Sequence, residues 1–351
     1  GHQKGEYQYL HPNNDVNMAQ STNDAYPTAI RLGLLLGHDA LLASLDSLIQ
    51  AFAAKGVEFS HVLKMGRTQL QDAVPMTLGQ EFRAFATTLG EDLQHLKLLA
   101  PTLLTEVNLG GTAIGTGINA DPQYQLLAVK RLAIISGQPL TPAADLIEAT
   151  SDMGAFVLFS GMLKRTAVKL SKICNDLRLL SSGPRTGINE INLPARQPGS
   201  SIMPGKVNPV IPEAVNQVAF QVIGNDLALT MAAEGGQLQL NVMEPLIAFK
   251  ILDSIRLLQR AMDMLREHCI VGITANEARC RELVEHSIGL VTALNPYIGY
   301  ENATRIARIA LESGRGVLEL VREEGLLDDA MLDDILRPEN MIAPRLVPLK
   351  A

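Results

Sequence analysis

Apolar residues recur at alternating steps of three and four along most of this chain, which is the spacing of one face of a helix. The longest such pattern begins about Asp145 and follows a heptad seam for about five heptads. Its positions are Leu146, Ala149, Met153, Phe156, Ser160, Leu163, Ala167, Leu170, Cys174, Leu177 and Ser181. At ~1.5 Å per residue this stretch predicts a rod of roughly 50 Å, which is typical of an elongated helical bundle.

Shorter helical patterns occupy most of the remaining sequence. They cover residues 29–55, 77–106, 121–137, 212–233 and 245–267, followed by 302–313, 317–324 and an acidic turn near 333–334. Thr77 with Gln80, and Thr274 with Glu277, have the spacing of a capping box at a helix start. We see no run of alternating β-type residues, and residues 1–20 predict only loops or short turns. The sequence therefore predicts an all-α fold, with a long helical-bundle domain over residues 1–271 and a small C-terminal helical domain over residues 272–351.

Polar residues concentrate in three short segments that the patterns place at helix ends, at residues 21–24, 66–72 and 199–208. The side chains of residues 21–24 are all good helix N-caps, but capping alone explains one or two of the four. A single chain folded as rods would hold the three segments apart. Rods that pack side by side in a symmetric oligomer would bring segments of different chains together, so we expect an oligomer.

The third polar segment, GSSIMPGKVNP at residues 199–209, is predicted to be a loop, because two Gly and two Pro interrupt both helix and strand. It carries two hydroxyls, an ammonium and an amide, and glycines at both ends suit a loop that closes over something small. It is not a phosphate-binding P-loop, since five residues separate Gly199 from Gly205 and Val207 stands where Ser or Thr is required. A connector whose polar groups only face water is the alternative. The glycine-rich run at residues 110–117 lacks the G-x-G-x-x-G order, so we reject a dinucleotide site there.

Composition narrows the possible partners. The net charge of the 351-residue chain is -7 and no basic block is visible, which argues against nucleic acid and against an anionic membrane surface. We find no apolar run of membrane-spanning length. The amino end is polar, so we expect no signal peptide. The odd number of cysteines, without C-x-x-C spacing, predicts buried thiols in a reducing cytoplasm: Cys174, Cys269 and Cys280. The seven histidines show no metal-ligand spacing, so we expect no metal.

The three polar segments resemble the recurring site segments of the fumarase/aspartase superfamily of homotetrameric lyases. These are QSTND at residues 20–24, GRTQLQDA at 66–73 and GSSIMPGKVNP at 199–209. The chain resembles the aspartase branch more than the fumarase branch, because Thr22 stands where fumarases usually have Ser and Gln69 where they have His. The stretch AAEGGQLQLNVMEP at residues 232–245 is also similar to aspartases. The resemblance covers nearly the whole chain and implies the long bundle of that superfamily.

One feature of the superfamily is missing from the sequence. Its members carry a further amino-terminal domain, in which a Thr-Ser-x-Asn-Met-Asn-type segment supplies part of the site. We find no such segment, and the chain begins where that domain would end. We therefore expect either a fragment or a site that lacks one wall.

The resemblance implies the conversion of L-aspartate to fumarate and ammonia, without a cofactor, in a homotetramer whose sites are shared between subunits. This reaction removes a proton from the carbon next to a carboxylate, so it needs a base at that carbon and donors for the charge that develops. By the same resemblance, Ser200 is the base, and Asn23 orients the amino group. The resemblance also implies that three residues donate to the reacting carboxylate: Ser21, Thr22 and Ser201. It implies that the other carboxylate is bound by Thr68, Lys206 and Asn208, with Gln69 beside them.

Two other functions stay open at this point. A fumarase would use the same fold to hydrate fumarate to malate, but loss of hydroxide needs better acid assistance, and Gln69 counts mildly against it. A catalytically silent, truncated helical scaffold is the alternative from another class, and the missing amino-terminal segment favours it.

Overall fold

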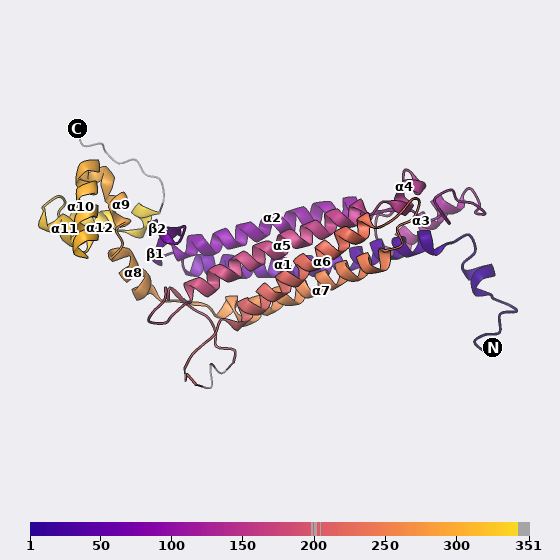
Figure 1. The fold of residues 1–351 in the computed structure, drawn as a ribbon, viewed down its shortest axis with the longest axis horizontal. Coiled ribbons are helices and arrows are strands. Elements are labelled where there is room, and N and C mark those ends of the chain that lie inside the picture. The colour runs from indigo at the N-terminus through magenta and orange to yellow at the C-terminus, as the bar shows by residue number, and fades with distance from the viewer. Residues whose placement is uncertain (198, 200–201, 204, 343–351) are drawn as a thin grey trace. The chain divides into compact units, whose positions relative to one another are not determined.

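The computed structural model describes residues 1–197, 199, 202–203 and 205–342, and most of them lie in helices, as the sequence predicts (Figure 1). Its contacts divide the chain into two compact units, each assembled from three stretches. Unit 1 comprises Gly1–Ser47, Leu89–Lys172 and Ala214–Asp263, and unit 2 comprises Leu48–Thr88, Ile173–Glu213 and Met264–Ala351. The two domains that we predict, residues 1–271 and 272–351, are continuous stretches, whereas each of these units combines three separate stretches. The predicted domain boundary stays a prediction.

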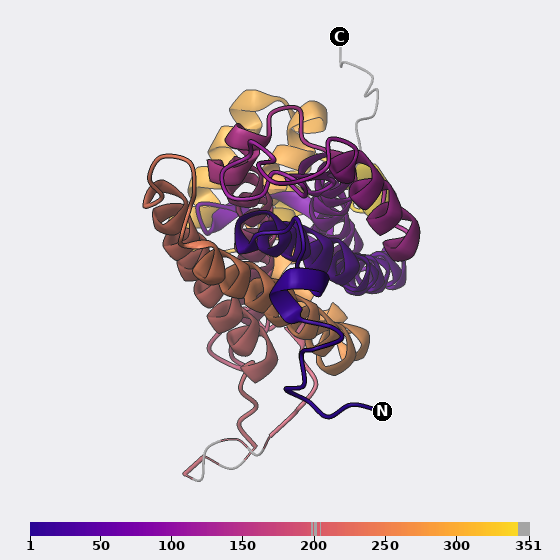
Figure 2. The same ribbon diagram turned by 90° about the vertical axis from the view of Figure 1, so that its right-hand side faces the viewer.

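The long helices of the predicted bundle are present. They are α1 (Thr22–Glu58), α2 (Leu78–Leu104), α5 (Gly154–Leu180), α6 (Val210–Glu234) and α7 (Glu244–His268), with shorter α3 (Tyr124–Ser136) and α4 (Leu146–Ser151). Within unit 1 the five long helices lie side by side (Figures 1 and 2). Buried hydrogen bonds join neighbours: His38 of α1 contacts the Leu96 carbonyl of α2 at 3.1 Å, and Ser160 of α5 donates to Asp226 of α6 at 2.8 Å. Residues 1–20 form turns and a short π-helix, Pro12–Val16.

The longest predicted helix is interrupted, which corrects the sequence interpretation. Asp145 begins α4 by accepting hydrogen bonds from the backbone N–H groups of Ile147 and Glu148. The helix stops at Asp152, whose backbone is extended and whose carboxylate accepts from Gly154 N–H at 2.9 Å. Asp152 thus ends one helix and caps the next, because its carboxylate accepts from a backbone N–H at the helix start that has no partner within the helix. The seam itself is confirmed by the burial of Met153, Phe156, Ser160, Leu163, Ala167, Leu170, Cys174 and Leu177.

Unit 2 contains a β-hairpin that the sequence interpretation missed. Strand β1 (Leu63–Thr68) pairs antiparallel with β2 (Gln71–Thr77), and the short β5 (Ile191–Asn192) pairs with β6 (Thr274–Ala275). The two-residue strands β3 (Glu106–Val107) and β4 (Thr141–Pro142) pair in unit 1. The polar segment at residues 66–72 therefore forms a hairpin turn and not a helix end. The Thr77–Gln80 capping box is confirmed by reciprocal bonds of 2.9 and 3.1 Å, whereas the one predicted at Thr274 is wrong, because that residue belongs to β6.

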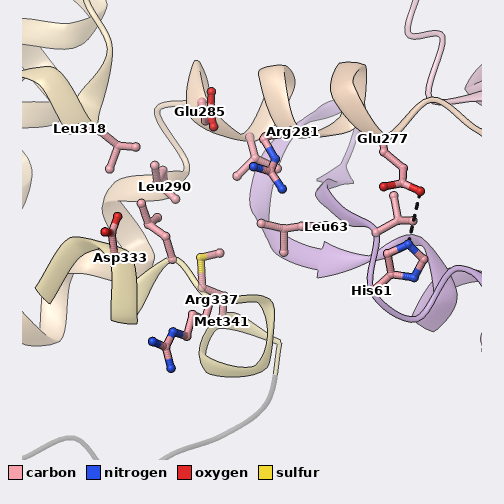
Figure 3. A pocket seen from close by; sticks show the side chains of 13 residues that line it. His61, Leu63, Glu277, Arg281, Glu285, Leu290, Leu318, Asp333, Arg337 and Met341 are labelled. Atoms are coloured by element: carbon pink, nitrogen blue, oxygen red, sulfur yellow. Dashed lines mark hydrogen bonds and ion pairs between the residues drawn. The ribbon is translucent and has the colours of Figure 1, made fainter. Parts of the chain in front are cut away.

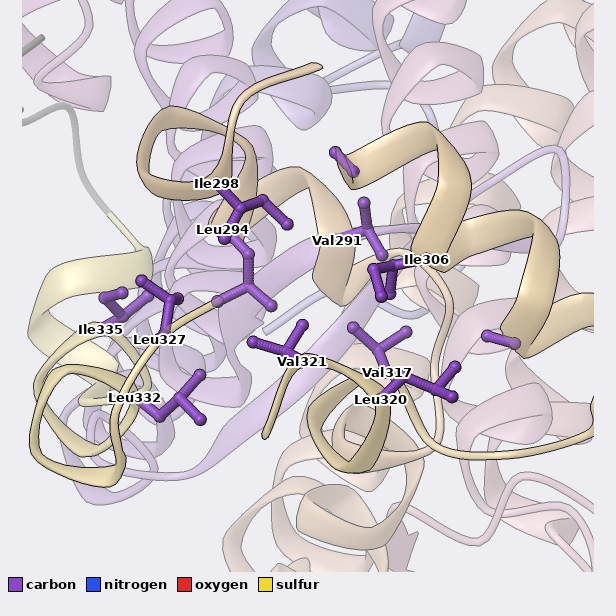
Figure 4. Close-up of a cluster of buried hydrophobic side chains, with 12 residues drawn as sticks. Val291, Leu294, Ile298, Ile306, Val317, Leu320, Val321, Leu327, Leu332 and Ile335 are labelled. Atoms are coloured by element: carbon purple, nitrogen blue, oxygen red, sulfur yellow. The ribbon is translucent and has the colours of Figure 1, made fainter. Parts of the chain in front are cut away.

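Short helices complete unit 2. They are the 3₁₀ turn Ile270–Gly272, α8 (Glu277–Glu285), α9 (Leu290–Ile298), α10 (Tyr300–Ser313), α11 (Val317–Glu323), α12 (Asp329–Ile335) and α13 (Pro338–Met341). Side chains from α9 to α12 converge in one buried cluster that includes Leu294, Ile306, Val321 and Leu332 (Figure 4). The sequence interpretation missed α9, whose pattern is broken by Pro296.

The prediction that no apolar run has membrane-spanning length is wrong for helix α1. By length and composition alone it is able to cross a membrane, and the core helix of a soluble protein passes the same test. The prediction of buried thiols is confirmed, since Cys174, Cys269 and Cys280 are all buried and unbonded to one another. Burial raises the pKa of Cys269 and of Cys280 to about 12, and it raises that of Cys174 further.

Glu244, at the start of α7, is a buried acid with an unusual titration. Its side chain is only 4% exposed, and its Oε1 has no hydrogen-bond partner among the described residues. Burial raises its pKa from 4.5 to about 7, although the nearby Arg31 guanidinium pulls the pKa down. A pKa that is higher in the folded state means that this carboxyl favours folding below pH ~4.5 and loses that contribution as the pH rises to about 7.

We therefore expect Glu244→Gln to stabilise the protein at pH 8 by about 1–3 kcal/mol and to change little at pH 4.5, because Gln cannot ionise. Urea unfolding of both proteins at the two pH values measures this difference. An equal change in unfolding free energy at both pH values would show that ionisation of Glu244 is not the cause.

Candidate functional site

The polar segment at residues 21–24 begins α1 in unit 1 and is held by its last member. Asp24 is fully buried, and its Oδ1 accepts from Ser21 N–H at 3.0 Å while Ser21 Oγ accepts from Asn23 N–H at 3.2 Å. Thr22 is exposed and donates to Asn23 Oδ1 at 3.3 Å. Ser21 and Asp24 thus cap the helix, and the side chains of Thr22 and Asn23 take no part in capping.

A glycine-rich loop at residues 110–117 packs against this helix start. Asp24 Oδ2 accepts from the N–H groups of Gly110 and Thr112 at 2.9 and 3.0 Å, and Asn23 Nδ2 donates to the Ala113 carbonyl at 2.7 Å. Gly110 has a φ of +94°, and a Cβ there would lie 2.7 Å from the Gln125 side chain. The sequence interpretation identified both segments and missed that a buried carboxylate joins them. The loop therefore sets the position of Asn23.

In unit 2 the predicted residues Thr68 and Gln69 lie at the tip of the β1–β2 hairpin. Thr68 pairs with Gln71, which leaves Gln69 and Leu70 as a two-residue turn. Both have positive φ, 53° and 64°, in positions that hairpins normally give to Asn or Gly. For a residue with a side chain this conformation costs about 1–2 kcal/mol. Such strain occurs preferentially at functional sites, which supports a role for this turn.

A buried ion cluster fixes the base of the same hairpin. Glu190 is fully buried, and its carboxylate lies 2.8 Å from Lys64 Nζ and 2.7 Å from an Arg67 nitrogen. Lys64 is 2% exposed and also pairs with Glu81 at 2.5 Å. Burial acts to lower the pKa of Lys64, but the two carboxylates outweigh it and raise that pKa. The two cations and two carboxylates balance, so the cluster is neutral overall.

Glu190 also ties the hairpin to the segment that precedes the predicted loop. Its backbone N–H donates to the Leu180 carbonyl, and its carbonyl accepts from Asn276 N–H at 2.8 Å. Its neighbours Asn189 and Ile191 line a cavity of about 240 Å³. The sequence interpretation singled out neither Lys64 nor Glu190, because each is an isolated charge whose partners are distant in sequence.

Two predicted substrate ligands, Lys206 and Asn208, line that same 240 Å³ cavity. Lys206 is exposed, and its ammonium has no ion-pair partner among the described residues. Gly199 lies against the other end of the loop, since a Cβ on it would come within 1.7 Å of the Lys206 carbonyl. The predicted base Ser200 and its neighbour Ser201 lie outside the described residues. The cavity thus offers one cation and amide groups to a small anion.

Comparisons with known proteins give the same family that the three polar segments resemble. A family described as Lyase matches residues 2–224, and one described as Fumarase C C-terminus matches residues 290–343. The chain is 97% identical over all 351 residues to a protein from Pseudomonas fluorescens named aspartate ammonia-lyase and spans 73% of its length. The chain belongs to the fumarase/aspartase family of lyases. This confirms the resemblance that the three polar segments indicate.

Solved structures of the fumarase/aspartase family share the fold. A crystal structure described as fumarate lyase:delta crystallin from Brucella melitensis bound to cobalt superimposes with a TM-score of 0.94 at 61% identity, covering 97% of this chain and 74% of that one. A class II fumarase from Schistosoma mansoni gives a TM-score of 0.87 at 36% identity, covering 95% and 73%. The prediction of a fumarase/aspartase-type all-α fold is thereby confirmed.

The predicted site residues of this family member fall into two groups. Ser21, Thr22 and Asn23 belong to unit 1, whereas Thr68, Gln69, Lys206 and Asn208 belong to unit 2. Within the described part of unit 2, no hydrogen bond or ion pair joins the hairpin pair to the cavity pair. The assignment of these residues to one substrate site stays a prediction.

Proposed function

We propose that this protein catalyses the reversible elimination of ammonia from L-aspartate to give fumarate. The observation that carries the proposal is the 97% identity, over the full chain, to a protein named aspartate ammonia-lyase. Relatives from Pseudomonas aeruginosa and Escherichia coli strain K12, 90% and 59% identical, bear the same name. The fumarase from Schistosoma mansoni is more distant, at 36% identity, which favours loss of ammonia over loss of water. We place the reaction in the cytoplasm.

The difficult step is removal of the proton from the carbon beside a carboxylate, and we assign it to Ser200. A serine hydroxyl is too weak a base in water, so the site must favour its alkoxide. Loop N–H groups, the ammonium of Lys206 and exclusion of water would supply that stabilisation. Ser21, Thr22 and Ser201 then donate to the carboxylate oxygens on which the negative charge develops. The leaving group departs already protonated, so a strong general acid is not required.

The local geometry of Asn23 supports its role with the substrate amino group. Its Nδ2 donates a hydrogen bond to the Ala113 carbonyl at 2.7 Å, which fixes the orientation of the amide. Oδ1 is the atom of this amide that accepts hydrogen bonds. That oxygen accepts from the Thr22 hydroxyl in the structure, and it becomes free to accept from a substrate ammonium when Thr22 donates to the substrate carboxylate instead. We assign the non-reacting carboxylate to Thr68, Lys206 and Asn208, with the neutral amide of Gln69 beside them.

Removal of the Lys206 ammonium should weaken substrate binding. We expect Lys206→Ala to raise KM about ten- to two-hundredfold, because a charge-assisted hydrogen bond contributes about 1.5–3 kcal/mol. Some loss of kcat is expected too, since the same ammonium would stabilise the alkoxide. Steady-state kinetics with L-aspartate measure both parameters, and Lys97→Ala, which removes an exposed lysine of α2, is the control. An unchanged KM would remove Lys206 from the carboxylate site.

Exposed apolar side chains in unit 1 support a homotetramer. Phe220, Leu227 and Met231 of α6 are 61–67% exposed, and Phe249 of the adjacent α7 is 62% exposed. They recur at helical spacing, and monomeric proteins rarely leave such a stripe in water. We propose that helices of other subunits cover it and that each site combines segments of different subunits. Light scattering should then give four chains per particle, and a well-folded monomer at micromolar concentration would contradict this assembly.

The function is tested by following fumarate in an absorbance assay. The protein should form fumarate from L-aspartate and much less from L-malate, because the amino group is recognised by Asn23. Preference for malate would identify a fumarase. Lack of activity with both substrates in a folded protein would favour the silent scaffold.

A further inference from the structure

A cavity of about 340 Å³ lies within unit 2, away from the predicted substrate ligands (Figure 3). Its walls come from residues 61–63 before and in β1, from α8 and the start of α9, from Leu318 and from α12 and α13. Its volume is in the range of small-molecule sites. We propose that this cavity binds a small monocarboxylate with an apolar body, with Arg281 as the group that binds its carboxylate.

The floor of the cavity is apolar. Val284 and Leu290 are 2% and 0% exposed and form a buried cluster with Met65. Leu63, Leu318, Leu336 and Met341 pack against that cluster and are partly exposed to the cavity. Such a floor favours a hydrocarbon chain, and each methylene buried there should tighten binding about three- to fourfold.

Arg281 is the cation that this cavity leaves available. His61 at the rim is already paired with Glu277 at 3.3 Å, and Arg337 lies 3.8 Å from the Asp334 carboxylate. Arg281, by contrast, has no hydrogen-bond or ion-pair partner among the described residues (Figure 3). Figure 3 shows its guanidinium turned into the space between α8 and β1. Arg279, two residues earlier, differs, because it is bound by Glu282 and the Ile188 carbonyl. A carboxylate is the planar anion that a free guanidinium binds best.

The other charged side chains limit the ligand to one negative charge. Two arginines, Arg281 and Arg337, line the cavity against three carboxylates, Glu277, Glu285 and Asp333, which gives a net charge of -1 with His61 neutral. A dianion would meet more repulsion than attraction, so dicarboxylates of the kind proposed for the catalytic reaction do not fit. The same carboxylates tolerate an ammonium, so the monocarboxylate is either a simple fatty acid or an apolar α-amino acid. This inference does not depend on the proposed function.

Calorimetric titration of the whole protein with hexanoate tests the proposal, with succinate present to occupy dicarboxylate sites. We expect saturable binding that Arg281→Gln weakens at least tenfold, that Arg281→Lys partly restores, and that the control Arg279→Gln leaves unchanged. Hexanedioate, which adds a second carboxylate to the same chain, should bind at least tenfold more weakly than hexanoate. Comparison with 2-aminohexanoate decides between the two sources, since tighter binding of that compound identifies an amino acid and weaker binding identifies a fatty acid.

Three outcomes would overturn the proposal. One is the absence of saturable hexanoate binding. Another is equal affinity of the protein and of Arg281→Gln, and the third is tighter binding of hexanedioate than of hexanoate. Because Arg281 is exposed and makes no hydrogen bond or ion pair among the described residues, its variants should unfold at the same temperature as the protein, which validates the comparison.

Discussion

Replacing Glu190 by Gln should lower the free energy of unfolding by about 3 kcal/mol. The substitution keeps the shape of the side chain and removes one of two carboxylates that neutralise Lys64 and Arg67. Lys64 is 2% exposed, so its excess charge cannot be relieved by water, and breaking a buried pair from one side costs about 3–5 kcal/mol. Glu81 still faces Lys64, which places the expected loss at the lower end.

A second substitution distinguishes charge balance from a general loss of packing. In the double variant Glu190→Gln, Lys64→Met the cluster keeps one cation, Arg67, and one carboxylate, Glu81, so its net charge is zero again and much of the lost stability should return. Glu282→Gln, which breaks an exposed pair with Arg279 in the same unit, should change the unfolding midpoint little. Denaturant unfolding measures all three variants. If Glu190→Gln unfolds at the same midpoint as the protein, the cluster does not stabilise the hairpin.

The helical part of the fold could be predicted because its pattern is local. A heptad seam and its caps lie within a few residues of one another, and the seam residues of α5 are indeed buried. The break at Asp152 was missed, because the apolar spacing continues through it and only the side-chain bond to Gly154 N–H reveals the new start. Thr274 was misassigned for a related reason: its spacing to Glu277 fits a capping box, but pairing with β5 places it in a strand.

The hairpin could not be predicted from turn chemistry. Its turn residues, Gln69 and Leu70, are poor choices for positive φ, and Gly66 and Pro75 in the flanking strands indicate loops when seen in sequence alone. Tertiary contacts from Lys64 and Arg67 of β1 to Glu190 hold the strands instead. Such conflicts with local preference are common at functional sites, which fits the proposed role of Thr68 and Gln69.

The polar segments of the site were found by their composition and by resemblance to a family, but their contacts were not. In the sequence Asp24 is only one of four adjacent residues that could cap a helix. In the structure its carboxylate accepts hydrogen bonds from two backbone N–H groups almost ninety residues further along the chain. Lys206 and Asn208 could be named from one loop, whereas the neighbouring wall at residues 189–193 carries no sequence signal. Chemistry at short range can be inferred from sequence, and partners across the fold require the structure.

Replacing Ser200 by Ala should lower kcat for L-aspartate about 10²–10⁴-fold, which is the usual contribution of a positioned general base. As the proposed base, this hydroxyl would act mainly in the transition state, so affinity for a non-reacting dicarboxylate should change little. This separates Ser200 from Lys206, whose loss should raise KM. Ser313→Ala, which removes an exposed hydroxyl bound to the Ile309 carbonyl, is the matched control and should keep full turnover.

Whether Ser200 is the base is tested by measuring fumarate formation from L-aspartate by the protein and by Ser200→Ala, together with succinate binding to both. We expect the protein to form fumarate rapidly and the variant to form almost none, while both bind succinate with similar affinity. Near-normal turnover by Ser200→Ala would show that another group removes the proton and that the loop only closes over the substrate.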